Sequence, residues 1–317
     1  MLKKKPRQWL DVHVYRKNPV LTALTVFIAF VLVLSLAFLG IRNKNEWGRD
    51  RRELLRYWEE GTYGDVYDLS GQWLAKKPLD FFLLSLRGFS SYQLAVAQIN
   101  VSDTLRYIDT CIVSLRKALL TREGERDANL RYVLGKAYYH KGPSYADLAI
   151  RYLEEARGSG FSAPDTAEYL GLAYAELSDY RNSVASLSES LNSEDGSYVS
   201  DLRLLAIARS YIGLDEGNSA RAYLVRCIGN SRDANVVIQA RLLLGKVLAA
   251  AGEAEGAEEQ FRAIIEENGE NADAHFELGE LYAAGGDATR ARAEWRRALR
   301  VDPGHGEART KLGVYTP

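Results

Sequence analysis

The sequence contains few of the residues that most often carry metal chemistry, with two cysteines and four histidines among 317 residues. It has no Cys-x₂-Cys pair, and no two histidines have the i, i+4 spacing of a helical zinc site. These absences argue against a metal centre. Cys111 and Cys227 both fall on apolar helical stripes, so we predict two buried thiols that act as small hydrophobic side chains. We assign His275 to a packing position and His140 to a turn between helices.

The chain also lacks a recognisable catalytic pair, because no nucleophile stands beside a candidate base. The segment Gly158–Gly160 follows an expected helix rather than a strand, and it lacks the Lys–Ser/Thr ending of a phosphate-binding loop. Paired acids such as Glu154 and Glu155 lie on helices of alternating charge, which is typical of solvated faces. We therefore predict that the protein is not an enzyme and that it uses no cofactor, no metal and no small-molecule substrate.

The formal net charge is only −1, but the charge is unevenly distributed. Residues 1–18 carry +5 and residues 42–56 carry +3, which leaves −9 for residues 57–317. An acidic body is a poor match for nucleic-acid phosphates, so we predict no nucleic-acid partner. Hydrophobic residues make up 47% of the chain and prolines number seven, a composition typical of a folded protein rather than a disordered one.

One long apolar run, residues 20–41, contains 22 residues and no charge. As a helix it would extend about 33 Å, enough to cross the roughly 30 Å hydrocarbon core of a bilayer. The alternative is a cleaved signal peptide, but its apolar region would be only about 7–15 residues long and would end at a small-residue cleavage site. We predict an uncleaved transmembrane helix over residues 20–41, between a short basic tail (1–19) and a juxtamembrane linker (42–46).

The orientation of this helix in the membrane is not decided by positive charge, because six Lys or Arg residues lie on each side of it. A short basic tail before a first apolar segment normally stays in the cytoplasm, and the second basic cluster is interleaved with acids. We therefore favour the cytoplasmic (inner) membrane with the body of the protein on the extracytoplasmic, periplasmic side. The opposite orientation is the alternative.

The rest of the chain repeats a pattern of two short amphipathic helices. Stepping backwards from Gly279, at intervals of 34 to 47 residues, gives equivalent positions at Gly245, Ala208, Gly171, Gly135, Gly88 and Leu54. In six units the second helix then offers a small residue followed four later by a large one: Ala291/Trp295, Ala257/Phe261, Ala220/Leu224, Ser183/Leu187, Ala149/Leu153 and Cys111/Leu115. Because two helices this short cannot enclose a core alone, the pattern predicts an array of stacked pairs.

This pattern resembles the tetratricopeptide repeat, which reads W-x₂-L-G-x₂-Y, then A-x₃-F, then P, with a period of about 34 residues. The last unit matches it through His275, Leu278, Gly279, Tyr282, Ala291, Trp295 and Pro303, with His in place of Trp and Trp in place of Phe. The resemblance implies an all-α fold, a right-handed α-solenoid of about seven helix pairs, here preceded by one transmembrane helix. We predict an array over residues 47–305 and a C-terminal cap and tail over residues 306–317. The predicted units are 47–80, 81–127, 128–163, 164–200, 201–237, 238–271 and 272–305.

The second unit departs most from the pattern. Arg87 stands where Leu is expected, and the unit is longer than its neighbours, with the surplus in residues 92–106. We expect the surplus to lengthen the first helix toward Ile99 and to add a turn near Asn100–Asp103. At the other end of the array, we expect Glu307–Leu312 to form one more turn of helix that covers the last apolar face.

In tetratricopeptide arrays, the first helix of each unit lines a concave groove that holds a peptide or a partner helix. Aromatic side chains with a few cations would suit an extended apolar segment that bears acidic groups. The alternative is that several of the aromatic residues only pack between adjacent first helices. Carried over to this chain, the groove candidates are Trp58, Phe82, Phe89, Tyr92, Tyr132, Lys136, Tyr139, Arg209 and Lys246.

Together these features predict a membrane-anchored scaffold that binds other proteins or peptides. Its expected role is to assemble or stabilise a multiprotein complex at a membrane or bacterial envelope. One alternative is a regulatory or adaptor protein that captures a single peptide or soluble enzyme in its groove. Another is a self-associating structural array, such as a motor-associated collar subunit.

Overall fold

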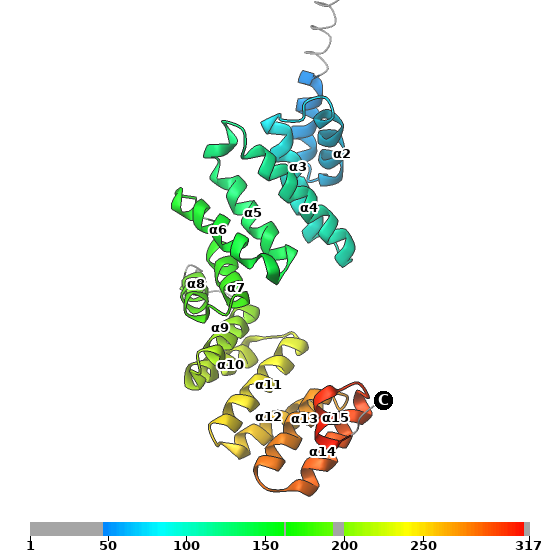
Figure 1. The fold of residues 1–317 in the computed structure, drawn as a ribbon, viewed down its shortest axis with the longest axis vertical. Coiled ribbons are helices and arrows are strands. Elements are labelled where there is room, and N and C mark those ends of the chain that lie inside the picture. The colour runs from blue at the N-terminus through cyan, green and yellow to red at the C-terminus, as the bar shows by residue number, and fades with distance from the viewer. Residues whose placement is uncertain (1–46, 162, 193–199, 314–317) are drawn as a thin grey trace, which may run out of the picture. The chain divides into compact units, whose positions relative to one another are not determined.

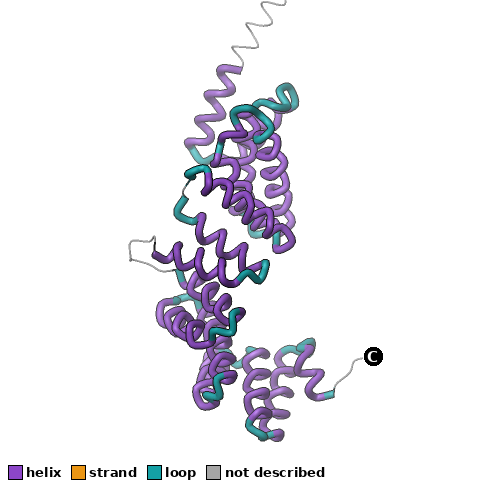
Figure 2. Tube along the Cα trace, turned by 60° about the vertical axis from the view of Figure 1, so that its left-hand side comes forward, coloured by secondary structure: helices purple, strands orange, loops and turns teal. Residues whose placement is uncertain are grey.

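The computed structural model describes residues 47–161, 163–192 and 200–313. Within these residues all regular elements are helices, joined mainly by short loops (Figure 2). The all-α prediction is therefore confirmed for the described part of the chain. The predicted transmembrane helix, 20–41, lies outside the described residues. None of the described helices is both long and apolar enough to cross a bilayer.

The chain divides into two units, Met1–Leu69 and Ser70–Pro317. The described part of the first unit contains a helix over residues 47–59 and the beginning of α2 (Tyr63–Leu74). The division falls inside α2, and therefore inside the predicted first repeat, 47–80.

The second unit is a succession of helix pairs that follow one another along the chain (Figure 1). Two short 3₁₀ segments, Gly124–Arg126 and Pro143–Tyr145, lie between helices. The pairs are α3 (Phe81–Val96) with α4 (Val101–Ala118), α5 (Ala128–Lys141) with α6 (Ala146–Gly158), α7 (Thr166–Glu176) with α8 (Tyr180–Asn192), α9 (Asp201–Gly213) with α10 (Gly217–Asn230), α11 (Ala234–Ala250) with α12 (Ala254–Glu267), and α13 (Ala272–Ala284) with α14 (Ala288–Val301). A single helix, α15 (Gly306–Leu312), follows the last pair.

The odd-numbered helices of the second unit form a layer of their own. Each helix packs against its partner and against the next helix along the chain. In addition, each odd-numbered helix from α3 to α13 contacts the next odd-numbered helix, whereas the described even-numbered helices make no comparable contacts with one another. The odd-numbered helices are therefore the closer-packed inner layer of a solenoid. The right-handed sense of that solenoid stays a prediction.

The marker glycines permit the close approach of the two helices in each pair. A Cβ atom built at each of these glycines would lie only 2.2–2.5 Å from a large side chain of the second helix, so no larger residue fits without movement. The facing pairs are Gly88 with Leu115, Gly135 with Leu153, Gly171 with Leu187, Gly245 with Phe261, and Gly279 with Trp295. These are the large residues that the repeat pattern identified, so the predicted packing of small against large residues is confirmed in these five pairs.

Two details of the predicted boundaries are wrong. The boundary between residues 237 and 238 falls inside α11, which begins at Ala234 because the Asp233 side chain caps it by accepting from the backbone N–H of Asn235 at 2.8 Å. The turn expected at Asn100–Asp103 is also misplaced, because Asn100 is the N-cap of α4 and its side chain accepts from the backbone N–H of Ser102. The surplus of the second unit therefore lengthens both α3 and α4.

The last apolar face is covered as expected. α15 packs against α14 and places the fully buried Ala308 in the same core as Trp295. Gly313 ends the helix in the left-handed conformation, at φ 69°. The C-terminal helix thus removes from water the surface that a further repeat would otherwise cover.

Both cysteines are free, and the burial that the sequence predicted is confirmed, with 0% of each side chain exposed. Burial raises the pKa of the Cys111 thiol and raises that of Cys227 to about 11, so both remain protonated and unreactive near neutral pH. His275 is buried between α13 and α14, where its Nδ1 lies 2.8 Å from the Glu294 carboxylate. It is a packing residue, as predicted.

Candidate partner-binding face

The candidate site is the side of the odd-numbered helices α3 to α13 that faces away from the even-numbered helices, which we call the inner face. Eight of the nine predicted groove residues lie on these helices, and Trp58 lies in the first unit, where its ring meets Tyr63 edge-on at 5.2 Å. The eight are Phe82, Phe89 and Tyr92 on α3, Tyr132, Lys136 and Tyr139 on α5, Arg209 on α9, and Lys246 on α11.

Lys136 is at the centre of the most connected group on this face. Its ammonium donates to Asp165 at 2.7 Å and to the Tyr132 hydroxyl at 3.0 Å. The same ammonium lies over three tyrosine rings, 5.3 Å from the centroid of Tyr92, 5.0 Å from that of Tyr132 and 4.7 Å from that of Tyr169. Because only 12% of the Lys136 side chain is exposed, these cation–π contacts are largely desolvated. The Lys136 ammonium therefore binds groups of this protein rather than offering its charge to a partner.

The group continues through hydroxyl and imidazole contacts among α3, α5 and α7. The Tyr169 hydroxyl lies 3.1 Å from His140 Nε2 and 3.4 Å from the Tyr92 hydroxyl. The Tyr139 ring packs edge-on against Tyr169, with 5.4 Å between centroids. We call the whole set the tyrosine–lysine cluster: Tyr92, Tyr132, Lys136, Tyr139, His140, Asp165 and Tyr169.

Burial and hydrogen bonding set the protonation of the cluster. Burial opposes the charge of Lys136, but its hydrogen bonds to Asp165 and Tyr132 outweigh this effect and raise the pKa of the ammonium above its ordinary value. Burial, together with donation to Asp165, raises the pKa of Tyr132 to about 12. Near neutral pH Lys136 therefore carries its charge beside the neutral phenol of Tyr132.

The sequence identified four members of this cluster and missed three. Asp165 and Tyr169 lie at the start of α7, about one repeat further along the chain, and no local pattern links them to Lys136. His140 was assigned to a turn, and this assignment is wrong because His140 lies in the last turn of α5. The alternative that these aromatic residues pack between neighbouring first helices therefore describes Tyr92, Tyr132 and Tyr139, and Phe89 is likewise half-buried against the core.

His140 predicts a specific pH dependence of stability. Burial, with a smaller contribution from the nearby Lys136 charge, lowers the pKa of His140 below its ordinary value of 6.5. The unfolded chain therefore binds this proton more readily, so the contribution of His140 to stability is complete above pH 6.5 and declines as the pH falls toward the folded pKa. In urea titrations, the free energy of unfolding of the native chain should fall relative to that of His140→Gln as the pH is lowered below 6.5. A difference that stays constant with pH would contradict this assignment.

A ladder of polar contacts joins each odd-numbered helix from α5 to α15 to the next one. The contacts recur about one repeat apart, and they involve all three cations that the sequence assigned to the groove. They are Lys136 with Asp165 at 2.7 Å, Arg203 with Glu168 at 3.3 Å, Arg209 with Gln239 at 2.7 Å, Lys246 with Glu277 at 2.8 Å, and Lys311 with Glu280 at 2.6 Å. The cations of this ladder thus hold neighbouring repeats in register, and three of them, Arg209, Lys246 and Lys311, are exposed enough to meet a partner as well.

An open hollow of about 210 Å³ lies between the C-terminal end of α9, the connection to α10 at Asp215 and Gly217, and α11. Its floor is apolar, with Ile212, Leu243 and Val247, and Ala250 leaves room at one side. Lys246 stands at its edge, 52% exposed although it is paired with Glu277. The predicted aromatic half of the groove is filled by its own side chains, whereas this more distal part is free to accept an apolar side chain.

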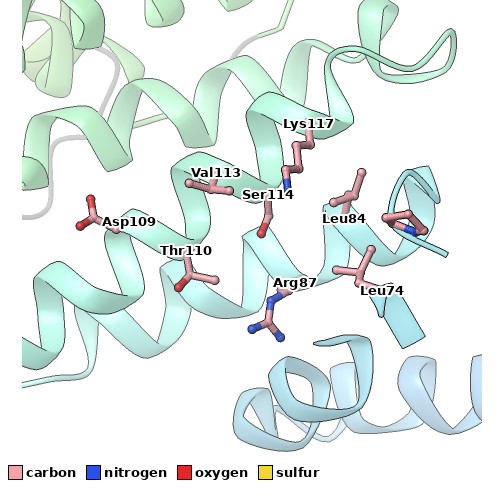
Figure 3. A pocket seen from close by; sticks show the side chains of 9 residues that line it. Leu74, Leu84, Arg87, Asp109, Thr110, Val113, Ser114 and Lys117 are labelled. Atoms are coloured by element: carbon pink, nitrogen blue, oxygen red, sulfur yellow. The ribbon is translucent and has the colours of Figure 1, made fainter. Parts of the chain in front are cut away.

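A larger cavity of about 420 Å³ lies beside α3 and α4 (Figure 3). Its lining combines apolar residues with Arg87, Lys117 and two hydroxyl groups, and the Asp109 carboxylate on its wall receives Lys141 at 2.7 Å. Arg87, which replaces the Leu of the repeat pattern, is accommodated because Gly71 lacks a side chain, since a Cβ there would lie 2.1 Å from the guanidinium. The cavity holds no paired nucleophile and base. Among the described residues, no group of three His, Cys, Asp or Glu side chains is placed to hold a metal ion.

Comparison with known families identifies the repeat. Residues 242–305, which form most of α11 to α14, match the family described as the tetratricopeptide repeat. This segment carries tetratricopeptide repeats. Because the matched segment includes Lys246 and Leu243, part of the hollow lies within repeats of this family. A search of curated proteins finds no match.

Solved structures with similar folds are also tetratricopeptide proteins or parts of protein complexes. The C-terminal part of a TPR repeat-containing protein from Cytophaga hutchinsonii has 15% identity and a TM-score of 0.58, covering 82% of this chain and 98% of that one. A chain of the APC/C hetero-tetramer Cut9–Hcn1 has 13% identity and a TM-score of 0.50, covering 82% and 47%. YrrB, a TPR protein with an unusual peptide-binding site, has 20% identity and a TM-score of 0.49, covering 63% and 97%. At these identities the likeness concerns the fold alone.

Proposed function

We propose that this protein is a non-enzymatic scaffold whose tetratricopeptide repeats bind segments of partner proteins on the inner face. The observation that carries the proposal is the open hollow between α9 and α11, with an apolar floor of Ile212, Leu243 and Val247. The exposed ends of Arg209 and Lys246 on the same two helices would attract an acidic group beside the inserted apolar side chain. The hollow is shallow and small, which favours several modest contacts along the face over one deep pocket.

The membrane part of the proposal rests on the sequence. The uncharged run 20–41 would anchor the chain in the cytoplasmic membrane of a bacterial envelope, and the repeats would face the periplasmic side. A reporter that is active only outside the cytoplasm, fused after residue 317, tests this orientation. An inactive fusion, together with activity of a second reporter that works only in the cytoplasm and is fused at the same position, would reverse the proposed topology.

Partner binding at the hollow can be tested with a photo-cross-linking amino acid at Ala250, which is exposed and lines the hollow. The matched control places the same amino acid at Glu259, an exposed position on the outer helix α12. In intact membranes we expect discrete protein adducts from position 250 and none from position 259. Equal adducts from both positions would argue against the inner face as the binding surface.

Filling the hollow should then release the cross-linked partner. Ala250→Arg adds a large side chain at the exposed end of α11 without removing any buried group. We expect co-purification of the partner to fall about tenfold, which corresponds to about 1.4 kcal/mol of binding free energy. Glu259→Arg should leave co-purification unchanged, and circular dichroism should show the same helix content for both variants.

A further inference from the structure

The α3–α4 hairpin ends in a group of exposed aliphatic side chains that the repeat pattern does not explain. α3 and α4, with 16 and 18 residues, form the longest pair among the described helices, and residues 97–100 connect them. At this end four side chains face water, which we call the apolar tip: Val96 is 49% exposed, Ile99 102%, Val101 72% and Leu105 37%. Ile99 is thus as exposed as it would be in an extended peptide, and it has no packing role.

The polar groups around the apolar tip are largely bonded within the hairpin. The Asn100 side chain accepts from the backbone N–H of Ser102 at 2.8 Å, and its carbonyl accepts from the Thr104 hydroxyl at 3.1 Å. The Gln98 amide donates to the Leu94 carbonyl at 3.2 Å. Because these groups already have partners, moving the tip out of water leaves few hydrogen bonds unmade. An exposed apolar group with satisfied polar neighbours is typical of a surface that is covered in the working state.

The residues next to the apolar tip favour a lipid surface as the covering partner. Arg106 and Tyr107 follow Leu105 on α4, and the guanidinium lies 4.6 Å from the centroid of the tyrosine ring, which is half-buried and also packs against the core. Tyrosine and long basic side chains are characteristic of the level where hydrocarbon meets lipid headgroups. The Arg106 side chain is 61% exposed, and its pairing with Asp103 at 3.1 Å is an exposed one that a lipid phosphate can replace.

The proposed anchor would also bring the folded part of the chain to such a surface. Only five residues, 42–46, separate the end of the apolar run from the helix that begins at residue 47, a reach of about 20 Å at most. With a tether this short, binding of the folded part to the same bilayer is intramolecular. Even an element with weak affinity for lipid can then be bound most of the time. We propose that the apolar tip inserts into the headgroup region of the bilayer that holds residues 20–41. This inference rests on the anchor in the proposed function, and it adds a second membrane contact in the second unit.

The test uses the full chain reconstituted into vesicles of phosphatidylcholine and phosphatidylglycerol. An environment-sensitive fluorophore is attached to Ile99→Cys, and the two native cysteines do not compete because both are fully buried. The matched control is Leu120→Cys, an aliphatic position just beyond the other end of α4 that is 82% exposed. We expect a blue-shifted emission and quenching by a lipid-attached quencher at position 99, and neither effect at position 120.

A second variant separates lipid contact from other causes. Val101→Asp places a carboxylate in the first turn of α4, a position that favours acids, so the hairpin should keep its fold while the tip loses its affinity for lipid. With this variant the blue shift at position 99 should disappear.

The tip proposal would be overturned, and the anchor left standing, if the native-sequence protein sediments with the vesicles while the fluorophore at position 99 emits as it does in water. A blue shift without lipid quenching would assign the tip to a protein contact and would also overturn it. Protein that fails to associate with the vesicles would instead refute the anchor.

Discussion

Gly135→Ala is expected to lower the free energy of unfolding by about 2 kcal/mol, although alanine is the better helix former. A Cβ atom at this position in α5 would lie 2.5 Å from Leu153 Cγ and 3.0 Å from the backbone carbonyl oxygen of Ala149. Leu153 is completely buried, and the Ala149 oxygen belongs to the backbone of α6, so neither atom can yield without moving the two helices apart. The separation of α5 from α6 would loosen the core that both helices share with α3 and α4.

The matched control is Gly229→Ala, the same substitution in a helix where nothing lies within 4 Å of the new Cβ. There the gain in helix propensity acts alone, and we expect stability to rise by about 0.5 kcal/mol. Urea unfolding followed by circular dichroism measures both effects, and the two variants should differ in sign. If both substitutions stabilised the protein, the close approach at Gly135 would not be what constrains the residue.

The packing within each pair was predictable because it depends on short-range pattern. A glycine in one helix and a large residue in the next, at a spacing that the repeat fixes, determine which side chains meet, as Gly279 and Trp295 illustrate. The boundary error at α11 has a local cause. The repeat spacing was measured from marker to marker, whereas the helix begins where Asp233 caps it, and a capping residue can shift relative to the marker. The Asp233 signal was present in the sequence and could have corrected the boundary.

The contacts of the tyrosine–lysine cluster could not be read from the sequence in the same way. Asp165 occupies the N-cap position of α7, and an aspartate there would ordinarily be assigned to capping. Its side chain makes no capping hydrogen bond, because Tyr132 and Lys136 of the preceding repeat already bind its carboxylate. Which residue of one repeat reaches which residue of the next depends on how the repeats are stacked. No one-dimensional pattern supplies that geometry.

The same stacking explains why the groove prediction identified the layer in which these residues lie but not which of them are exposed. Aromatic residues and cations on the first helices were identified correctly as residues of the inner layer, but their solvent exposure was not. The aromatic residues of α3, α5 and α7 pack against one another and fill the space between these helices. The smaller side chains of α9 and α11, such as Ala250, leave space open. In this part of the array, small residues mark the open surface better than large ones.

Lys136→Met is expected to lower the free energy of unfolding by about 2–3 kcal/mol, because it breaks a largely buried ion pair and three cation–π contacts at once. Methionine keeps most of the side-chain volume, so the loss reports the charge rather than a cavity. Asp165 is 35% exposed and keeps its bond from Tyr132, which limits the cost of leaving the carboxylate without its cation. Asp165→Asn should be less harmful in the Lys136→Met background than in the native chain, since the two residues interact directly.

Lys246→Met tests whether this effect belongs to the cluster or to any rung of the ladder. Lys246 makes the equivalent contact between α11 and α13, at 2.8 Å from Glu277, but its side chain is 52% exposed and no aromatic ring of the described residues lies against its ammonium. An exposed pair of this kind contributes about 0–1 kcal/mol, and added salt should reduce the difference further. We therefore expect Lys136→Met to shift the urea midpoint several times more than Lys246→Met does. Equal shifts would mean that the tyrosine rings add nothing to the binding of the lysine, and that the cluster stabilises the array no more than an ordinary surface ion pair.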